Sequence, residues 1–160
     1  MKVELKQLME CYQQNLYAVA FNVCKSAEDA EDAVQDTFLQ YYTGNYKFES
    51  EQHIRAWLIR VTINKAKNAN RTFWRQNKVS LEEYMETLSF ETPESEHLFE
   101  TVMEMPQKYR IVIHLFYYED YSVKEIADIL HISESNVKIR LSRGRTMLKE
   151  ILQEAWDDDK

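Results

Sequence analysis

Apolar residues recur every three or four positions along most of the chain, a spacing that places them on one face of an α-helix. The pattern predicts amphipathic helices over residues 3–24, 27–43, 54–75 and 94–105, another from Pro106 onward, and a pair within Tyr121–Leu148. The chain has only two glycines and two prolines, which leaves few residues for the tight turns of a sheet protein. We therefore expect an all-α fold.

The pair of short helices within Tyr121–Leu148 carries the clearest local signals. Ser122 can cap the first helix, and Glu125 three residues later can close a capping box. A turn over His131–Ser133 follows, and its last residue can cap the second helix. The pattern is typical of a helix-turn-helix, although an ordinary helical hairpin with a solvated basic face would share it.

The second helix of this pair has an apolar and a polar side. At roughly 100° per residue, the apolar stripe consists of Val137, Leu141, Gly144 and Leu148. The opposite side carries Ser135, Ile139, Ser142 and Thr146, flanked by Lys138 and Arg143. Residues 136–149 include five basic residues and no acidic one. A basic helix with short outward side chains suits the major groove of DNA.

Residues 106–149, PQKYRIVIHLFYYEDYSVKEIADILHISESNVKIRLSRGRTMLK, resemble the C-terminal DNA-binding region of bacterial sigma factors of the extracytoplasmic-function type. The resemblance implies that the second helix reads the −35 promoter element. The residues implied to face bases or nearby phosphates are Ser135, Asn136, Lys138, Ile139, Arg140, Ser142, Arg143 and Arg145. His131 stands where the family usually has glycine, and histidine tolerates positive φ better than a β-branched residue.

The predicted helix over residues 27–43 has a polar outer side. Ser26 can cap it, and Asp32, Gln35 and Asp36 point away from the apolar face. From physics alone this is a capped, solvated helix. The run DAEDAVQDTFLQYY, however, is similar to the sigma-factor segment that docks on the clamp helices of the largest RNA polymerase subunit, and this similarity makes the three polar residues polymerase-contact candidates.

The predicted helix over residues 54–75 carries a basic stripe that follows a loop over residues 44–53. The sequence IRAWLIRVTINKAKN resembles the family's helix that opens and reads the −10 element. The loop can supply a pocket for an unstacked base, or its aromatic residues can fold back onto the core. The basic stripe can likewise be a solvated face. The −10 candidates are Asn45, Tyr46 and Phe48 in the loop, and Arg60, Asn64, Lys67 and Arg71 on the helix.

Charge is distributed unevenly along the chain, whose net charge is −7. Residues 51–80 carry +6 and residues 81–120 carry −8. Residues 79–97 contain six Glu and no Lys or Arg, which predicts an acidic linker between an N-terminal domain at 1–78 and a C-terminal domain at 98–160. The two basic islands indicate two nucleic-acid contacts, and the acidic parts predict weak non-specific DNA binding by the free protein.

The sequence has no motif for nucleotide hydrolysis, metal binding or nucleophilic catalysis. It has no glycine-rich phosphate loop, its four histidines are scattered, and no nucleophile–base pair is evident. We expect no catalysis, cofactor or metal. With no signal peptide, membrane-spanning run or lipidation motif, we expect a cytoplasmic protein that does not insert into membranes. The resemblance to bacterial sigma factors implies that this cytoplasm is a bacterial one. Cys11 and Cys24 are expected to be free, buried thiols.

These features favour an alternative sigma factor. By resemblance its partners are core RNA polymerase, promoter DNA and an anti-sigma factor, and we expect a monomer when no partner is bound. One alternative is a conventional activator or repressor, which would bind its operator without polymerase. A third hypothesis is an anti-sigma-like or adaptor protein that binds only proteins, and the outward basic stripe at Arg60–Arg71 argues against it.

Overall fold

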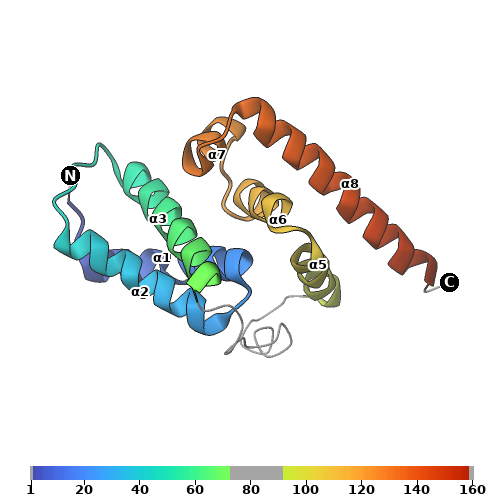
Figure 1. Cartoon of the computed structure of the whole chain (residues 1–160), viewed down its shortest axis with the longest axis horizontal. Coiled ribbons are helices and arrows are strands. Elements are labelled where there is room, and N and C mark those ends of the chain that lie inside the picture. The colour runs from blue at the N-terminus through green and yellow to red at the C-terminus, as the bar shows by residue number, and fades with distance from the viewer. Residues whose placement is uncertain (1, 73–91, 159–160) are drawn as a thin grey trace. The chain divides into compact units, whose positions relative to one another are not determined.

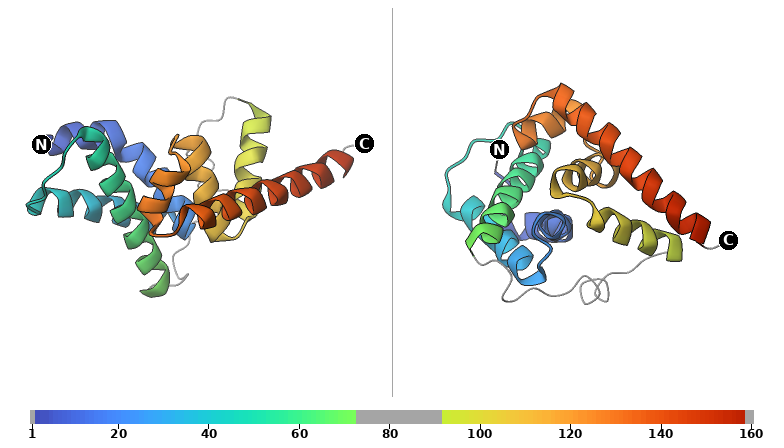
Figure 2. Two further views of the ribbon diagram at one scale, coloured as in Figure 1. Left: turned by 90° about the horizontal axis from the view of Figure 1, so that it is seen from above. Right: turned by 45° about the vertical axis from the view of Figure 1, so that its right-hand side comes forward.

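The structure is a computed structural model that describes residues 2–72 and 92–158, with all their side chains except those of residues 70–72, 95 and 154–158. Every regular element within these residues is a helix, as the apolar pattern predicts. The chain divides into two compact units, residues 1–80 and 81–160, drawn in Figures 1 and 2. No helix in the described part of the chain is long and apolar enough to cross a membrane.

The N-terminal unit is a bundle of three helices, each in contact with the other two. They are α1 (Leu5–Cys24), α2 (Ala27–Thr43) and α3 (Glu51–Thr72). The apolar stripes meet in a core that includes Leu8, Leu16, Val19, Phe21, Val34, Phe38, Ile54, Leu58 and Ile63. Because each helix buries one face, the opposite faces of α2 and α3 remain available for partners.

Polar caps set the starts of α2 and α3. The Ser26 hydroxyl accepts a hydrogen bond from the Asp29 amide at 3.2 Å, which confirms the predicted cap and the helix over Ala27–Thr43. The start of α3 was predicted three residues too late. There the Ser50 hydroxyl accepts from the His53 amide at 3.1 Å, so the helix begins at Glu51 and the connecting loop covers only residues 44–50.

The C-terminal unit consists of α5 (Pro93–Glu104), α6 (Gln107–Ile113), the π-helix η1 (His114–Tyr118), α7 (Val123–Leu130) and α8 (Glu134–Asp158). Residues 93–97 are helical and part of α5, in agreement with the helix predicted over 94–105 and not with the linker predicted over 79–97, which overlapped it. Residues 79–91 of that linker lie outside the described part of the chain. Pro106 occupies the N-cap position of α6 with ψ 143°, rather than the first helical position as predicted.

The helix α8 is the longest element and organises its unit. It runs without interruption from Glu134 to Asp158 (Figure 2), which extends it beyond the pair of helices predicted within Tyr121–Leu148. Its buried side packs on α5, α6 and α7. At its centre a Cβ added to Gly144 would lie only 3.1 Å from Cγ1 of Ile113, so α6 and α8 approach closely at this position.

Candidate nucleic-acid interface

The turn between α7 and α8 has the geometry of a helix-turn-helix. The capping box is formed as predicted, with Glu125 N donating to Ser122 Oγ at 3.1 Å and Ser122 N donating to Glu125 Oε1 at 3.0 Å. His131 follows α7 in the left-handed region, at φ 57° and ψ 44°. The position that glycine usually fills in the family therefore does require positive φ here, and histidine adopts it.

The start and orientation of α8 follow from one cap and two buried side chains. The Ser133 hydroxyl accepts from the Asn136 amide at 3.0 Å, so the predicted N-cap is confirmed. Val137 is 0% exposed and Leu141 is 2% exposed. With these two residues turned into the core, the other side of the helix must face solvent.

The outward side of α8 matches the predicted DNA-reading set in its exposure. Six of the eight residues are exposed, namely Ser135, Lys138, Ile139, Ser142, Arg143 and Arg145, and Asn136 and Arg140 are half-buried. Ile139 is 48% exposed and lies between these polar and basic side chains. An apolar side chain among serines and arginines fits a groove that offers thymine methyl groups and base edges.

Two tyrosines, Tyr109 and Tyr117, bind arginines on the outward side of α8. Hydrogen bonding from Arg143, supported by Lys108, lowers the pKa of the Tyr109 hydroxyl. Arg145 Nε donates to the Tyr117 hydroxyl at 2.6 Å. Neither Tyr109 nor Tyr117 is among the residues that the sequence singled out as DNA contacts.

The basic side of α3 is exposed as predicted. Arg60, Asn64 and Lys67 are all at the surface, while Ile59, Ile63 and Ala66 on the other side are at most 2% exposed. The side chain of Arg71 lies outside the described part of the chain. The three described residues step by four and three positions, so they form one stripe along the helix.

The loop before α3 departs from the prediction of an open base pocket. Phe48 is buried (7% exposed), with its ring 5.9 Å from that of Tyr41 and 5.7 Å from that of Trp57. Asn45 and Tyr46 are exposed, but the Tyr46 ring lies 4.6 Å from Trp57. The hollow beside them measures about 20 Å³ and could hold no more than a water molecule. Phe48 therefore follows the second alternative given for this loop, in which its aromatic residues fold back onto the core, since its ring packs in an aromatic cluster.

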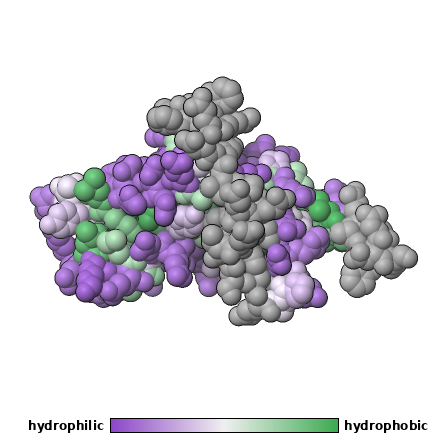
Figure 3. Space-filling view, turned by 90° about the horizontal axis from the view of Figure 1, so that it is seen from below, coloured by the Kyte–Doolittle hydropathy of each residue, from purple (hydrophilic) through white to green (hydrophobic). Residues whose placement is uncertain are grey.

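The outer side of α2 presents more than the three polar residues that the sequence singled out. Asp32, Gln35 and Asp36 are exposed. Leu39 (59% exposed) and Tyr42 (64% exposed) continue this stripe toward the end of the helix. Figure 3 shows apolar surface between hydrophilic groups on the N-terminal unit. The sequence could have revealed this, because Leu39 and Tyr42 follow Gln35 at helical spacing and so lie on the side of α2 that faces away from the core.

Two family models match the chain, and together they cover most of it. Residues 8–77 match sigma-70 region 2, and residues 96–148 match sigma-70 region 4. The first match covers α1 to α3, with the basic stripe and the exposed α2 face. The second covers the helix-turn-helix and its supporting helices.

Whole proteins and a solved structure agree with these matches. The ECF RNA polymerase sigma factor SigW of Bacillus subtilis (strain 168) is 26% identical over 164 residues, covering 92% of this chain and 88% of the relative. The ECF RNA polymerase sigma-E factor of Haemophilus influenzae is 29% identical, covering 88% and 83%. The fold is shared with the sigma factor RpoE of Bartonella quintana, solved with the anti-sigma factor NepR, at a TM-score of 0.74 and 20% identity, covering 92% and 96%. The chain belongs to the sigma-70 family of bacterial RNA polymerase sigma factors, and within it to the extracytoplasmic-function type.

Proposed function

We propose that this sigma factor divides promoter recognition between its two units, with the N-terminal unit binding polymerase and the −10 element and the C-terminal unit reading the −35 element. As an alternative sigma factor the chain directs core RNA polymerase to specific promoters. The observation that carries the proposed division is the outward face of α8, where Ile139 is 48% exposed among serines and arginines.

At the −35 element, α8 lies in the major groove with its N-terminal half toward the bases. Ser135, Ile139 and Ser142 face base edges, because they occupy the centre of the outward side. Arg143 reads a guanine or holds a nearby phosphate, and Asn136, Lys138, Arg140 and Arg145 lie toward the two phosphate backbones that bound the groove.

At the −10 element, the stripe of Arg60, Asn64 and Lys67 on α3 binds the phosphate backbone of the opened strands. Arg71 one turn further along continues the stripe in the sequence. Asn45 and Tyr46 contact the displaced bases, and the buried Phe48 ring packs against the Tyr46 ring. The Tyr46 ring packs against Trp57 in the DNA-free protein. A base would therefore have to displace the Tyr46 ring before it could stack on an aromatic ring at this site.

Core polymerase binds the outer side of α2. Asp32, Gln35 and Asp36 provide polar contacts to the clamp helices of the largest subunit. Leu39 and Tyr42 add the apolar area that such an interface requires at its centre.

Further partners follow from the family. Two solved structures that share this fold are complexes, one of the sigma factor RpoE with the anti-sigma factor NepR and one of CnrH with the cytosolic domain of CnrY. We infer that an anti-sigma factor also holds this chain inactive in the cytoplasm, and that the free chain is a monomer. Sigma factors are generally non-enzymatic, so the catalysis belongs to the polymerase and this chain supplies strand capture without hydrolysis.

The test is transcription by purified core RNA polymerase, with and without this protein, on a library of fragments from the source genome. Start sites that depend on the added protein are expected, and aligning them gives both promoter elements at once. If no start site appeared while the protein alone protected a defined DNA site, the chain would act as a conventional activator or repressor instead.

A further inference from the structure

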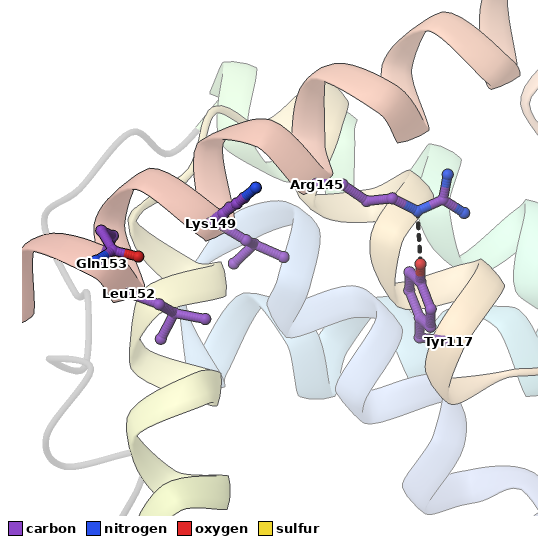
Figure 4. A pocket seen from close by; sticks show the side chains of 6 residues that line it. Tyr117, Arg145, Lys149, Leu152 and Gln153 are labelled. Atoms are coloured by element: carbon purple, nitrogen blue, oxygen red, sulfur yellow. Dashed lines mark hydrogen bonds between the residues drawn. The ribbon is translucent and has the colours of Figure 1, made fainter. Parts of the chain in front are cut away.

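Arg145 is the most constrained of the exposed arginines on α8. Its Nε donates to the Tyr117 hydroxyl at 2.6 Å (Figure 4). Its guanidinium carbon also lies 5.5 Å from the ring centre of Phe116 and 5.6 Å from that of Tyr117. One hydrogen bond and two aromatic faces therefore hold a side chain that would otherwise sample many rotamers.

The two aromatic residues that contact Arg145 belong to η1, which is a π-helix. Its wider turn is closed by the Glu119 amide, which donates to the His114 carbonyl at 3.2 Å. Phe116 and Tyr117 stand next to each other with their rings 5.0 Å apart and nearly perpendicular. A single π-turn inside a helical segment is frequently found at functional sites.

The held guanidinium still has unused donors. Tyr117 takes only the Nε–H, and Figure 4 shows the two terminal nitrogens directed away from the tyrosine. Within the described residues no hydrogen bond from these nitrogens is recorded. An arginine fixed at one nitrogen with its outer pair open can bind a phosphate in a two-pronged manner.

The position of Arg145 around α8 matches a phosphate rather than a base. At roughly 100° per residue, Arg145 lies about 20° from Lys138 and about 60° from Ser142. It therefore lies at one edge of the reading face, with Arg143 toward the other edge. A helix in the major groove is bounded at both edges by a phosphate backbone.

We propose that Tyr117 is a positioning residue, which holds the Arg145 guanidinium ready for a phosphate at the border of the −35 element. This inference rests on the proposed function of α8. By fixing Arg145 before DNA arrives, Tyr117 removes the ordering cost of that side chain from the binding step. The contact stabilises binding to all sequences alike and selects no base.

The test uses holoenzyme assembled from core polymerase and full-length variants, with equilibrium binding to a promoter fragment found by the transcription mapping. Tyr117→Phe keeps the ring and removes only the hydroxyl. We expect it to weaken binding by about 2- to 12-fold, the cost of ordering one long side chain. The loss should be equal on fragments with altered −35 bases. Its salt dependence should match that of wild type, because no charge is removed.

A double-mutant cycle isolates the coupling. Arg145→Ala should lower the slope of log affinity against log salt by about 0.9, the value for one phosphate contact. Tyr117→Phe should have no further effect in that background. Tyr118→Phe is the matched control, since it removes a neighbouring hydroxyl for which no hydrogen bond to α8 is recorded in the described chain, and it should bind as wild type does.

Three outcomes would overturn the proposal. These are an unchanged salt slope in Arg145→Ala, an equal effect of Tyr117→Phe with and without Arg145, or a loss of affinity for core polymerase in Tyr117→Phe. The failure of the wider function is distinguishable, because wild-type holoenzyme would then produce no dependent start site. Thermal unfolding of each variant verifies that the fold is retained.

Discussion

At the scale of the residue, His131 shows how one backbone angle limits the choice of amino acid. It holds φ 57°, a left-handed conformation that costs a residue with a Cβ about 1–2 kcal/mol. Glycine avoids this cost but gives the unfolded chain more freedom, worth about 0.4–1 kcal/mol. We therefore expect His131→Gly to raise the free energy of unfolding by up to about 1 kcal/mol in urea titrations. A clear destabilisation would mean that the exposed imidazole makes a contact that the turn needs.

Tyr109 reports on the placement of Arg143. The hydrogen bond from Arg143 and the proximity of Lys108 lower its pKa below 10.0, whereas burial raises the pKa of Tyr12, Tyr17 and Tyr118. Tyr109 should therefore ionise before the other three in an NMR titration of tyrosine Cζ. Because the folded-state pKa is depressed, the stability from this contact is present above about pH 10 and is lost as pH falls through the folded-state value.

The same titration tests the arginine directly. Arg143→Ala should return the pKa of Tyr109 toward 10.0, since the guanidinium is the main cause of the shift. Arg140→Ala, which removes an arginine of α8 that is not among those causes, should leave it in place. If the two variants gave the same titration curve, Arg143 would not be held by Tyr109 in solution.

Single residues also show where sequence reasoning succeeds. Caps at Ser26, Ser122 and Ser133 were predictable because a short polar side chain bonds the amide three residues ahead within one helix turn. The burial of Phe48 was left open by the sequence, because it depends on how the loop folds back between α2 and α3 to bring its ring against Tyr41 and Trp57. Cys11 was expected to be buried and is exposed, since its position on α1 lies just outside the packed stripe.

At the scale of the element, the packing of α8 on α6 depends on the smallest side chain. A Cβ at position 144 would lie 3.1 and 3.2 Å from two carbons of Ile113 and 3.4 Å from Met105 Cε. Gly144→Val should therefore lower the free energy of unfolding by about 1–3 kcal/mol through overpacking, as measured in urea. Thr146→Val is the control at an exposed position, expected to stay within about 0.5 kcal/mol of wild type. A Gly144→Val protein of wild-type stability would contradict this close approach.

The basic stripe of α3 makes a prediction about promoter opening. Removing the two proposed phosphate contacts by Arg60→Ala with Lys67→Ala should impair strand separation at the −10 element while leaving the fold intact, because both residues are exposed. Permanganate reactivity of the opened thymines measures this. Lys6→Ala with Lys25→Ala, two exposed lysines of the same unit away from the stripe, is the matched control. Reactivity at the wild-type level in the α3 variant would exclude the stripe from opening.

Element boundaries show the limits of periodicity. The repeat of apolar residues predicted α1, α2, α3 and α8, but it could not reveal η1. A π-turn inserts one residue into an otherwise continuous helical pattern, and the local preferences of HLFYY do not distinguish the two windings. Phe116 and Tyr117, which contact Arg145, lie in this turn, and the sequence offered no sign of these contacts.

At the scale of the whole molecule, the excess of acidic residues opposes DNA binding by the basic faces of α3 and α8. The net charge is −7, and the surface of α5 contributes Glu94, Glu96, Glu100 and Glu104. Because acidic side chains repel the negatively charged DNA backbone, a free sigma factor of this composition should have low affinity for non-specific DNA. We expect binding to become strong only when polymerase supplies further contacts, so that promoter recognition depends on the holoenzyme.

This dependence can be measured on the free protein by fluorescence anisotropy with a random-sequence duplex at physiological salt. Non-specific binders usually reach Kd values of about 10⁻⁴–10⁻⁶ M, and we expect this chain at about 10⁻⁴ M or weaker. Changing the four α5 glutamates to glutamine raises the net charge by four, from −7 to −3, and should tighten binding. The same four changed to aspartate keep the charge and should bind as wild type does. Equal affinity of the glutamine and aspartate variants would show that the acidic surface does not restrain the free protein, and that its dependence on polymerase has another cause.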